Sequence, residues 1–204
     1  MIGIVGKKIG MSQIFQENGE LTPVSVIEAG PCPILQVKDE SNDGYKAIQV
    51  GFGTKKRITK AIAGHLKKSK TKSVGRILEI RINDASKYKT GDNIDVTVFA
   101  SGDKVSVTGW TKGRGFSGGM KRWGWSGGPK THGSMAHRRI GSSGPGSAPG
   151  RIWKNKTMPG RYGNEQVTVK NLRVVKVEKE KNMLYLKGAV PGARNSYLVI
   201  TKEE

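Results

Sequence analysis

The chain has 204 residues, a formal net charge of +20 and one cysteine. This length fits one or two domains, and the lone Cys32 excludes a disulfide framework within the chain and a multi-cysteine zinc site. No apolar run approaches the ~20 residues of a membrane span, and the N-terminus lacks the apolar run of a signal peptide. We therefore expect a soluble cytoplasmic protein.

The N-terminal half predicts a series of short strands. Residues 13–16 and 21–28 form a hairpin pattern, because Asn18-Gly19 between them supplies a left-handed turn. A turn is also expected at residues 41–44, and the best helix candidate is residues 60–68. Further strands are predicted at residues 34–38, 47–51, 76–82, 94–99 and 104–108.

The C-terminal part continues this pattern. Strands are expected at residues 166–178, 183–187 and 197–201, with turns at residues 179–182 and at Pro191-Gly192. Many short strands with few helices indicate a mainly β protein built as a small closed barrel. We assign residues 1–103 and 165–204 to this barrel domain, with a short helical insertion.

Residues 104–164 contain no acidic residue. These 61 positions hold twelve Lys or Arg residues, all four tryptophans and about half of the glycines. Surfaces of globular proteins mix both charge signs, so the missing negative charge indicates a polyanionic partner such as a phosphate backbone. The segment lies between two predicted strands, and its composition cannot bury a core. We expect a Gly-rich basic extension, flexible when free and ordered on its partner.

Alternative interpretations of the positive charge and the motifs are weaker. A solvated surface fits residues 67–72 but not 61 positions without an acid. Residues 113–118 match G-x-G-x-x-G, but the βαβ unit and the acidic residue of a dinucleotide site are missing, so no cofactor is predicted. His132 and His137 lack further ligands for a metal and are better interpreted as RNA-contacting groups. No Ser, His and Asp arrangement indicates catalysis.

The tryptophans admit two interpretations. Trp123, Trp125 and Trp153 stand among Gly, Lys and Arg, so stacking on RNA bases competes with packing on the extension itself. Trp110 stands at a predicted strand end and is interpreted as structural.

Several motifs carry a resemblance to a known family. Residues 99–122, with Thr-Gly-Trp-Thr-Lys-Gly-Arg-Gly-Phe-Ser-Gly at 108–118, resemble the signature of the L-three family of large-subunit ribosomal proteins. The resemblance covers essentially the whole chain, and the short length is similar to the bacterial branch. Further similar motifs follow in the family's order at residues 3–11, 43–50, 63–65, 158–160, 163–165 and 187–192.

The resemblance implies a fold and a role. The family has a six-stranded-type barrel similar to the second domain of translation elongation factors, plus a long extension. It implies that the barrel contacts the three-prime part of the large rRNA and that the extension, with a tip at residues 144–149, runs toward the peptidyl transferase centre. It further implies a part in early assembly, no catalysis, and the ribosomal proteins L-fourteen and L-nineteen as neighbours.

From the residues and the resemblance together we predict the rRNA contacts. Lys7 and Lys8 are candidates on a basic barrel face. The tip comprises Gly144, Pro145, Gly146, Ser147, Ala148 and Pro149. The extension contributes Lys112, Arg114, Lys121, Arg122, Trp123, Trp125, Lys130, His132, His137, Arg138, Arg139, Arg151, Trp153, Lys154, Lys156 and Arg161.

Two positions depart from the family pattern. Ser106 stands where the family signature usually has Asp or Asn, a conservative polar change. Ser147 aligns with a glutamine that is methylated in some bacterial members, and no glutamine occurs from Lys104 to Asn164. We therefore predict that this modification is absent.

Two rival functions remain open at the level of sequence. One is an RNA-modifying enzyme with a basic substrate-binding segment, and the other is a free nucleic-acid chaperone. The enzyme would be recognised by altered nucleotides after incubation with rRNA. The second requires binding to DNA and RNA without a preferred site.

Overall fold

A computed structural model describes residues 2–16 and 18–202 of the chain. The chain divides into two compact units. We call Met1–Thr111 with Gln166–Glu204 the barrel unit, and Lys112–Glu165 the arm. The chain is mainly β, as the sequence predicts. The division falls after Thr111, eight residues beyond the start of the acid-free segment, because the first residues of that segment form a strand of the barrel unit.

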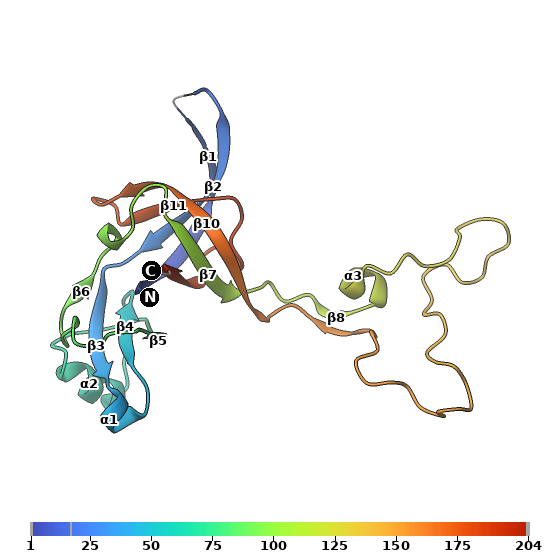
Figure 1. The fold of residues 1–204 in the computed structure, drawn as a ribbon, viewed down its shortest axis with the longest axis horizontal. Helices are drawn as coiled ribbons and strands as arrows, with labels where there is room; N and C mark the ends of the chain where they lie inside the picture. Colours follow the sequence, from blue (N-terminus) through green and yellow to red (C-terminus); the bar gives the residue numbers. More distant parts are fainter. Residues whose placement is uncertain (1, 17, 203–204) are drawn as a thin grey trace. The chain divides into compact units, whose positions relative to one another are not determined.

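Six strands of the barrel unit pair in a ring (Figure 1). Each pairs antiparallel with its neighbours, and the last returns to the first, forming a closed barrel. The cyclic order is β1 (Ile2–Phe15), β12 (Tyr197–Lys202), β7 (Lys104–Trp110), β10 (Gln166–Glu178), β11 (Met183–Lys187) and β2 (Leu21–Ala29). The core inside is aliphatic, as strand alternation requires, with Val105 and Val107 of β7 both buried.

The predicted hairpin joins β1 to β2. Phe15 pairs with Leu21, and Gly19 takes a φ of 80° in the turn. The amide of Gly19 donates to the carbonyl of Gln16 over 2.9 Å. Glu17, which the predicted turn also includes, lies outside the described residues. β1 continues toward the N-terminus well beyond the predicted strand, so the hairpin is one end of a long barrel strand.

A second sheet of four strands follows β2. Its order is β5 (Arg76–Arg81), β4 (Ala47–Phe52), β3 (Cys32–Lys38) and β6 (Asn93–Ile94). The predicted turn at residues 41–44 overlaps the one-turn helix α1 (Glu40–Asp43), which ends at Gly44 with a φ of 78°. Between β4 and β5 lies α2 (Lys60–Lys67), close to the predicted bounds.

The strand predicted at residues 94–99 is wrong beyond its first residue. Val96–Val98 form a 3₁₀ helix, η1, in which the amide of Phe99 donates to the carbonyl of Val96 over 3.0 Å. Burial selects Ile94, Val96 and Phe99 instead of every second residue. The apolar alternation therefore comes from the end of β6, which buries Ile94, and from a tight turn that buries Val96 and Phe99.

The arm has its own short elements. β8 (Gly115–Ser117) pairs with β9 (Gly160–Tyr162), and α3 (Gly119–Trp123) follows β8. All of residues 112–165 are described, and the buried ones among them are Ser117, Gly119 and Gly163. No large apolar side chain is buried in the arm, so local hydrogen bonds and glycine contacts hold it together.

Candidate nucleic-acid interface

The charge of the arm is one-sided. Its 54 residues hold eleven Lys or Arg residues and a single acid, Glu165. In the barrel unit, by contrast, cations meet carboxylates, as in Lys202 with Asp103 at 2.7 Å and Lys176 with Glu178 at 2.6 Å. The arm cannot balance its own charge internally, so an anionic partner is its natural complement.

A small hairpin forms the base of the arm. Gly115, Phe116 and Ser117 pair with Tyr162, Arg161 and Gly160. The amide of Arg114 extends the ladder by donating to the carbonyl of Tyr162 over 2.8 Å. This pairing fixes where the arm leaves and returns, and the side chains of Arg114 and Arg161 are exposed beside it.

The carbonyl of Met158 is the central acceptor of the arm. The Arg122 guanidinium and the indole N–H of Trp123 each donate to it over 2.8 Å. The Arg122 guanidinium also lies over the Trp123 ring, 4.9 Å from its centroid. Trp123 remains 48% exposed, so its indole N–H is held by the hydrogen bond while the rest of the ring is open to a partner.

Trp125 packs against the backbone of the arm. Its ring packs so closely on Gly119 that a Cβ at that position would overlap it. Trp125 is therefore half-buried within the arm, and its predicted stacking on RNA stays a prediction for the part of the ring that is open. Glycine at position 119 is required by this contact.

The outer part of the arm is organised by its backbone. The amide of Gly128 donates to the carbonyl of His137 over 2.7 Å, and Gly127 takes a φ of 76° beside that carbonyl. An open cavity of about 710 Å³ lies between residues 125–128 and 135–141. The whole predicted tip, residues 144–149, is exposed.

Most predicted contact residues of the arm are available to a partner. All are exposed except Arg122 and Trp125, which are half-buried. Trp153 is 57% exposed, and the Arg151 guanidinium lies 5.2 Å from its ring centroid. A cation beside an exposed aromatic ring suits both phosphate and base.

The two lysines predicted on the docking face of the barrel, Lys7 and Lys8, differ in their burial. Lys8 is only 9% exposed, and its ammonium donates to the carbonyl of Val190 over 2.8 Å and to that of Gly192 over 3.4 Å. This corrects the prediction that Lys8 lies on a docking face, because its charge is used inside the protein. Lys7 is half-buried on the other face of β1. Trp110, interpreted as structural, is 52% exposed.

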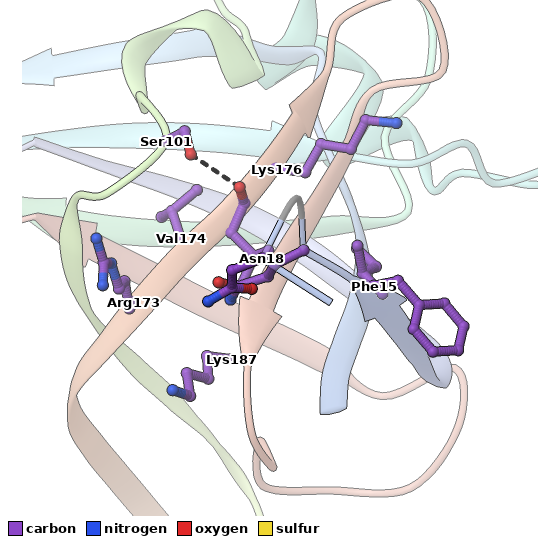
Figure 2. Close-up of a pocket in the computed structure, with 10 residues that line it drawn as sticks. Phe15, Asn18, Ser101, Arg173, Val174, Lys176 and Lys187 are labelled. Carbon is purple, nitrogen blue, oxygen red and sulfur yellow. Dashed lines mark hydrogen bonds between the residues drawn. The ribbon is translucent and has the colours of Figure 1, made fainter. Parts of the chain in front are cut away.

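A cavity of about 490 Å³ lies beside the hairpin of β1 and β2 (Figure 2). Arg173, Lys176 and Lys187 contribute cations to its lining, together with Phe15. The described lining residues include no histidine and no carboxylate. The cations of this lining favour an anion.

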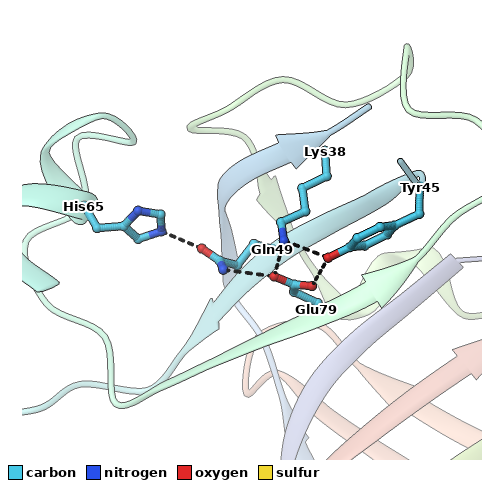
Figure 3. Close-up of polar contacts among 5 residues, drawn as sticks. All are labelled: Lys38, Tyr45, Gln49, His65 and Glu79. Carbon is cyan, nitrogen blue, oxygen red and sulfur yellow. Dashed lines mark hydrogen bonds and ion pairs between the residues drawn. The ribbon is translucent and has the colours of Figure 1, made fainter. Parts of the chain in front are cut away.

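A polar network ties the second sheet to α2 (Figure 3). The Lys38 ammonium lies 2.8 Å from a Glu79 carboxylate oxygen and donates to the Tyr45 hydroxyl over 2.8 Å. Gln49 donates to the same carboxylate over 3.3 Å and meets the His65 ring at 2.5 Å. The Lys38 ammonium holds the pKa of Glu79 below its ordinary value. These groups satisfy one another, which indicates a structural role.

The described residues were compared with the requirements of a metal site, a reactive thiol and a membrane span. Among the described residues, no three His, Cys, Asp or Glu side chains gather as a metal site, and His132 and His137 are both exposed. Burial raises the pKa of the Cys32 thiol to about 12, and the thiol donates to the carbonyl of Val5 over 3.3 Å. Cys32 is thus an unreactive core residue. The described helices include none with the length and apolar sequence needed to cross a membrane.

A mainly β domain with a basic, acid-poor and aromatic-bearing arm defines the chain as a nucleic-acid-binding protein. The chain matches the family described as "Ribosomal protein L3" over residues 35–185. It is 52% identical over 200 residues to the "Large ribosomal subunit protein uL3" of Pseudothermotoga lettingae, with 97% of this chain and 95% of that protein covered. The protein of the same name from Thermotoga maritima is 51% identical, with 97% and 95% covered. The one from Herpetosiphon aurantiacus is 48% identical, with 98% and 95% covered. The chain belongs to the ribosomal protein L3 family.

Proposed function

We propose that the arm binds large-subunit rRNA by screening phosphates of neighbouring RNA helices. The observation that carries this is the eleven cations and one acid of Lys112–Glu165, in a unit that buries no large apolar side chain. Such a unit gains its stability from the partner that neutralises it. The small side chains of glycine and serine let the arm lie in the narrow space between RNA helices.

Family membership sets the wider role. The chain is a structural, non-enzymatic constituent of the large ribosomal subunit and is associated with ribosomes in the cytoplasm. The proposal adds finer detail: the exposed tip at residues 144–149 approaches the peptidyl transferase region, and the protein acts early in assembly. The barrel, of the elongation-factor second-domain type, contacts the three-prime part of the rRNA. L-fourteen and L-nineteen are the proposed protein neighbours.

The exposed cations and the exposed tryptophans of the arm have different proposed roles. Lys and Arg side chains meet phosphates, which fixes position without reading sequence. Trp153 and the open part of Trp123 stack on bases or riboses, since both rings are about half-exposed beside an arginine. Trp125 supports the arm from within.

Replacing the arm by a turn tests the proposal. Trp110 and Gln166 are directly paired, so Asn-Gly in place of residues 111–165 closes β7 onto β10 as a two-residue hairpin. Binding of a full-length large-subunit rRNA transcript is then measured against salt for both proteins. If half of the arm's cations neutralise phosphates, the slope of log affinity against log salt becomes shallower by about four. An unchanged slope in a folded variant would place the RNA contact elsewhere.

A further inference from the structure

The arm consists of two parts that differ in burial. We call residues 112–125 with 158–165 the arm base, and residues 126–157 the outer arm. All three buried residues of the arm belong to the arm base, whereas the outer arm is exposed at all but three of its 32 positions. The two parts therefore differ in how far the chain fixes its own conformation without a partner.

Backbone contacts bring the two ends of the arm base together. The carbonyl of Lys112 lies so close to Gly163 that a Cβ at position 163 would overlap it, and Gly163 takes a φ of 72° there. The paired strands β8 and β9 follow directly. The outgoing and returning segments of the arm are thus aligned before α3 begins.

Arg122 ties α3 to the returning segment. Its Nη1 donates to the carbonyl of Met158, 36 positions away, over 2.8 Å. The guanidinium also fills the space beside Gly160, since a Cβ at that position would lie 2.5 Å from Nη1. The Trp123 ring packs against the guanidinium, and its indole N–H donates to the same Met158 carbonyl over 2.8 Å. We call these four residues the Arg122 clasp.

The clasp occupies the Arg122 side chain within the arm. A guanidinium is planar and directs its N–H donors along fixed lines, so a hydrogen bond and a neighbouring ring together fix its orientation. Arg122 is half-buried, whereas the other ten Lys and Arg residues of the arm are exposed. Less of its charge is open to phosphate, and its contacts organise the arm instead.

The outer arm is held by contacts of shorter range. The amide of Gly128 donates to the carbonyl of His137 over 2.7 Å, and the amide of Lys156 to that of Trp153 over 3.4 Å. These bonds join residues nine and three positions apart. They shape single loops and do not tie the outgoing chain to the returning chain.

We propose that the arm base is preformed in the free protein and that Arg122 is its positioning residue, which presents the outer arm to large-subunit rRNA from a fixed base. This inference rests on the proposed function and adds an internal role for one cation of the arm. A segment already held in its bound conformation loses less entropy on binding, so the clasp raises affinity without touching RNA. The ordering that RNA must supply is then confined to the outer arm.

Hydrogen exchange of the free, unaltered chain tests the preformed base. Mass spectrometry compares the backbone amides of the arm base with those of the outer arm. Slower exchange is expected in β8, in β9 and at the amide of Arg114, which donates to the carbonyl of Tyr162 over 2.8 Å. Equal exchange in the two parts would show that the base is not preformed and would overturn the proposal. This readout needs no RNA.

Gly160→Ala tests the role of Arg122 without changing any charge. The added Cβ displaces the guanidinium, and Gly160 is not among the glycines with positive φ, so its backbone accepts alanine. Gly118→Ala is the matched control, because a Cβ there would have no neighbour within 4 Å. Affinity for a full-length large-subunit rRNA transcript should fall about tenfold in Gly160→Ala and little in the control, with the same salt dependence. Equal affinities of the two variants would contradict the positioning role.

Arg122→Gln separates positioning from phosphate contact. We expect affinity to fall about tenfold, with an unchanged slope of log affinity against log salt. A slope shallower by about one would assign Arg122 to a phosphate and overturn the proposal. Adding Gly160→Ala to this variant should change nothing further, because no guanidinium remains to be displaced. Additive losses would show that Gly160 acts through another contact, which would exclude the clasp.

The two kinds of readout separate this inference from the proposed function. If the unaltered chain does not bind the transcript, the proposed function fails. The exchange measurement still decides in that case whether the arm base is preformed.

Discussion

Replacing Lys8 by methionine removes a buried ammonium and keeps most of the alkyl chain. The carbonyls of Val190 and Gly192 then lose their donor. A buried carbonyl left without a partner costs about 1–3 kcal/mol, and relief from burying a charge offsets part of this. We expect a net loss of about 2–3 kcal/mol. With a urea slope of about 2 kcal/mol/M, the unfolding midpoint falls by about 1 M.

The assay is urea unfolding of the free chain followed by far-ultraviolet circular dichroism. Lys7→Met is the matched control, because the neighbouring residue lies on the opposite face of β1. It should lower the midpoint far less. The affinity of Lys8→Met for rRNA should keep its dependence on salt. An unaltered midpoint together with a salt slope shallower by about one would show that Lys8 reaches phosphate, and would refute the structural role.

Three further changes test other parts of the account. Gly119→Ala should shift tryptophan emission of the free chain by displacing Trp125, and an unaltered spectrum would contradict that packing. The Lys38 ammonium lowers the pKa of Glu79. The ionised carboxylate therefore stabilises the fold above the ordinary pKa of 4.5, and this stabilisation is lost as pH falls through the lowered pKa. Glu79→Gln should cost about 0.5–1 kcal/mol at pH 7, discounted for exposure, and progressively less as pH falls through the lowered pKa of Glu79; a loss that does not shrink with falling pH would exclude an ionic origin. Trp153→Ala should weaken rRNA binding by about 1–3 kcal/mol and the exposed Ile152→Ala far less, whereas equal effects would exclude stacking.

Local signals predict most of the strands. Asn18-Gly19 places the first hairpin, and the bounds of β10 and β11 coincide with the predicted ones. These segments combine valine-rich or alternating residues with clear turns. The strand predicted at residues 94–99 is wrong because alternation alone does not distinguish a strand from a 3₁₀ turn that buries Val96 and Phe99.

The fate of single side chains depends on contacts distant in the sequence. Lys8 and Lys7 are equivalent in sequence, yet the carbonyl that holds the Lys8 ammonium lies 182 residues away. Among the tryptophans of the arm, Trp125 is distinguished by its packing on Gly119, which the sequence around it does not indicate.

The most direct test of the central claim is sedimentation of tagged protein from a cell lysate, followed by a high-salt wash. The account predicts retention in large-subunit particles at near one copy per particle, because the arm and the barrel unit together hold rRNA. Recovery mainly in light fractions, or easy removal by salt, would contradict it and favour an exchangeable chaperone or enzyme.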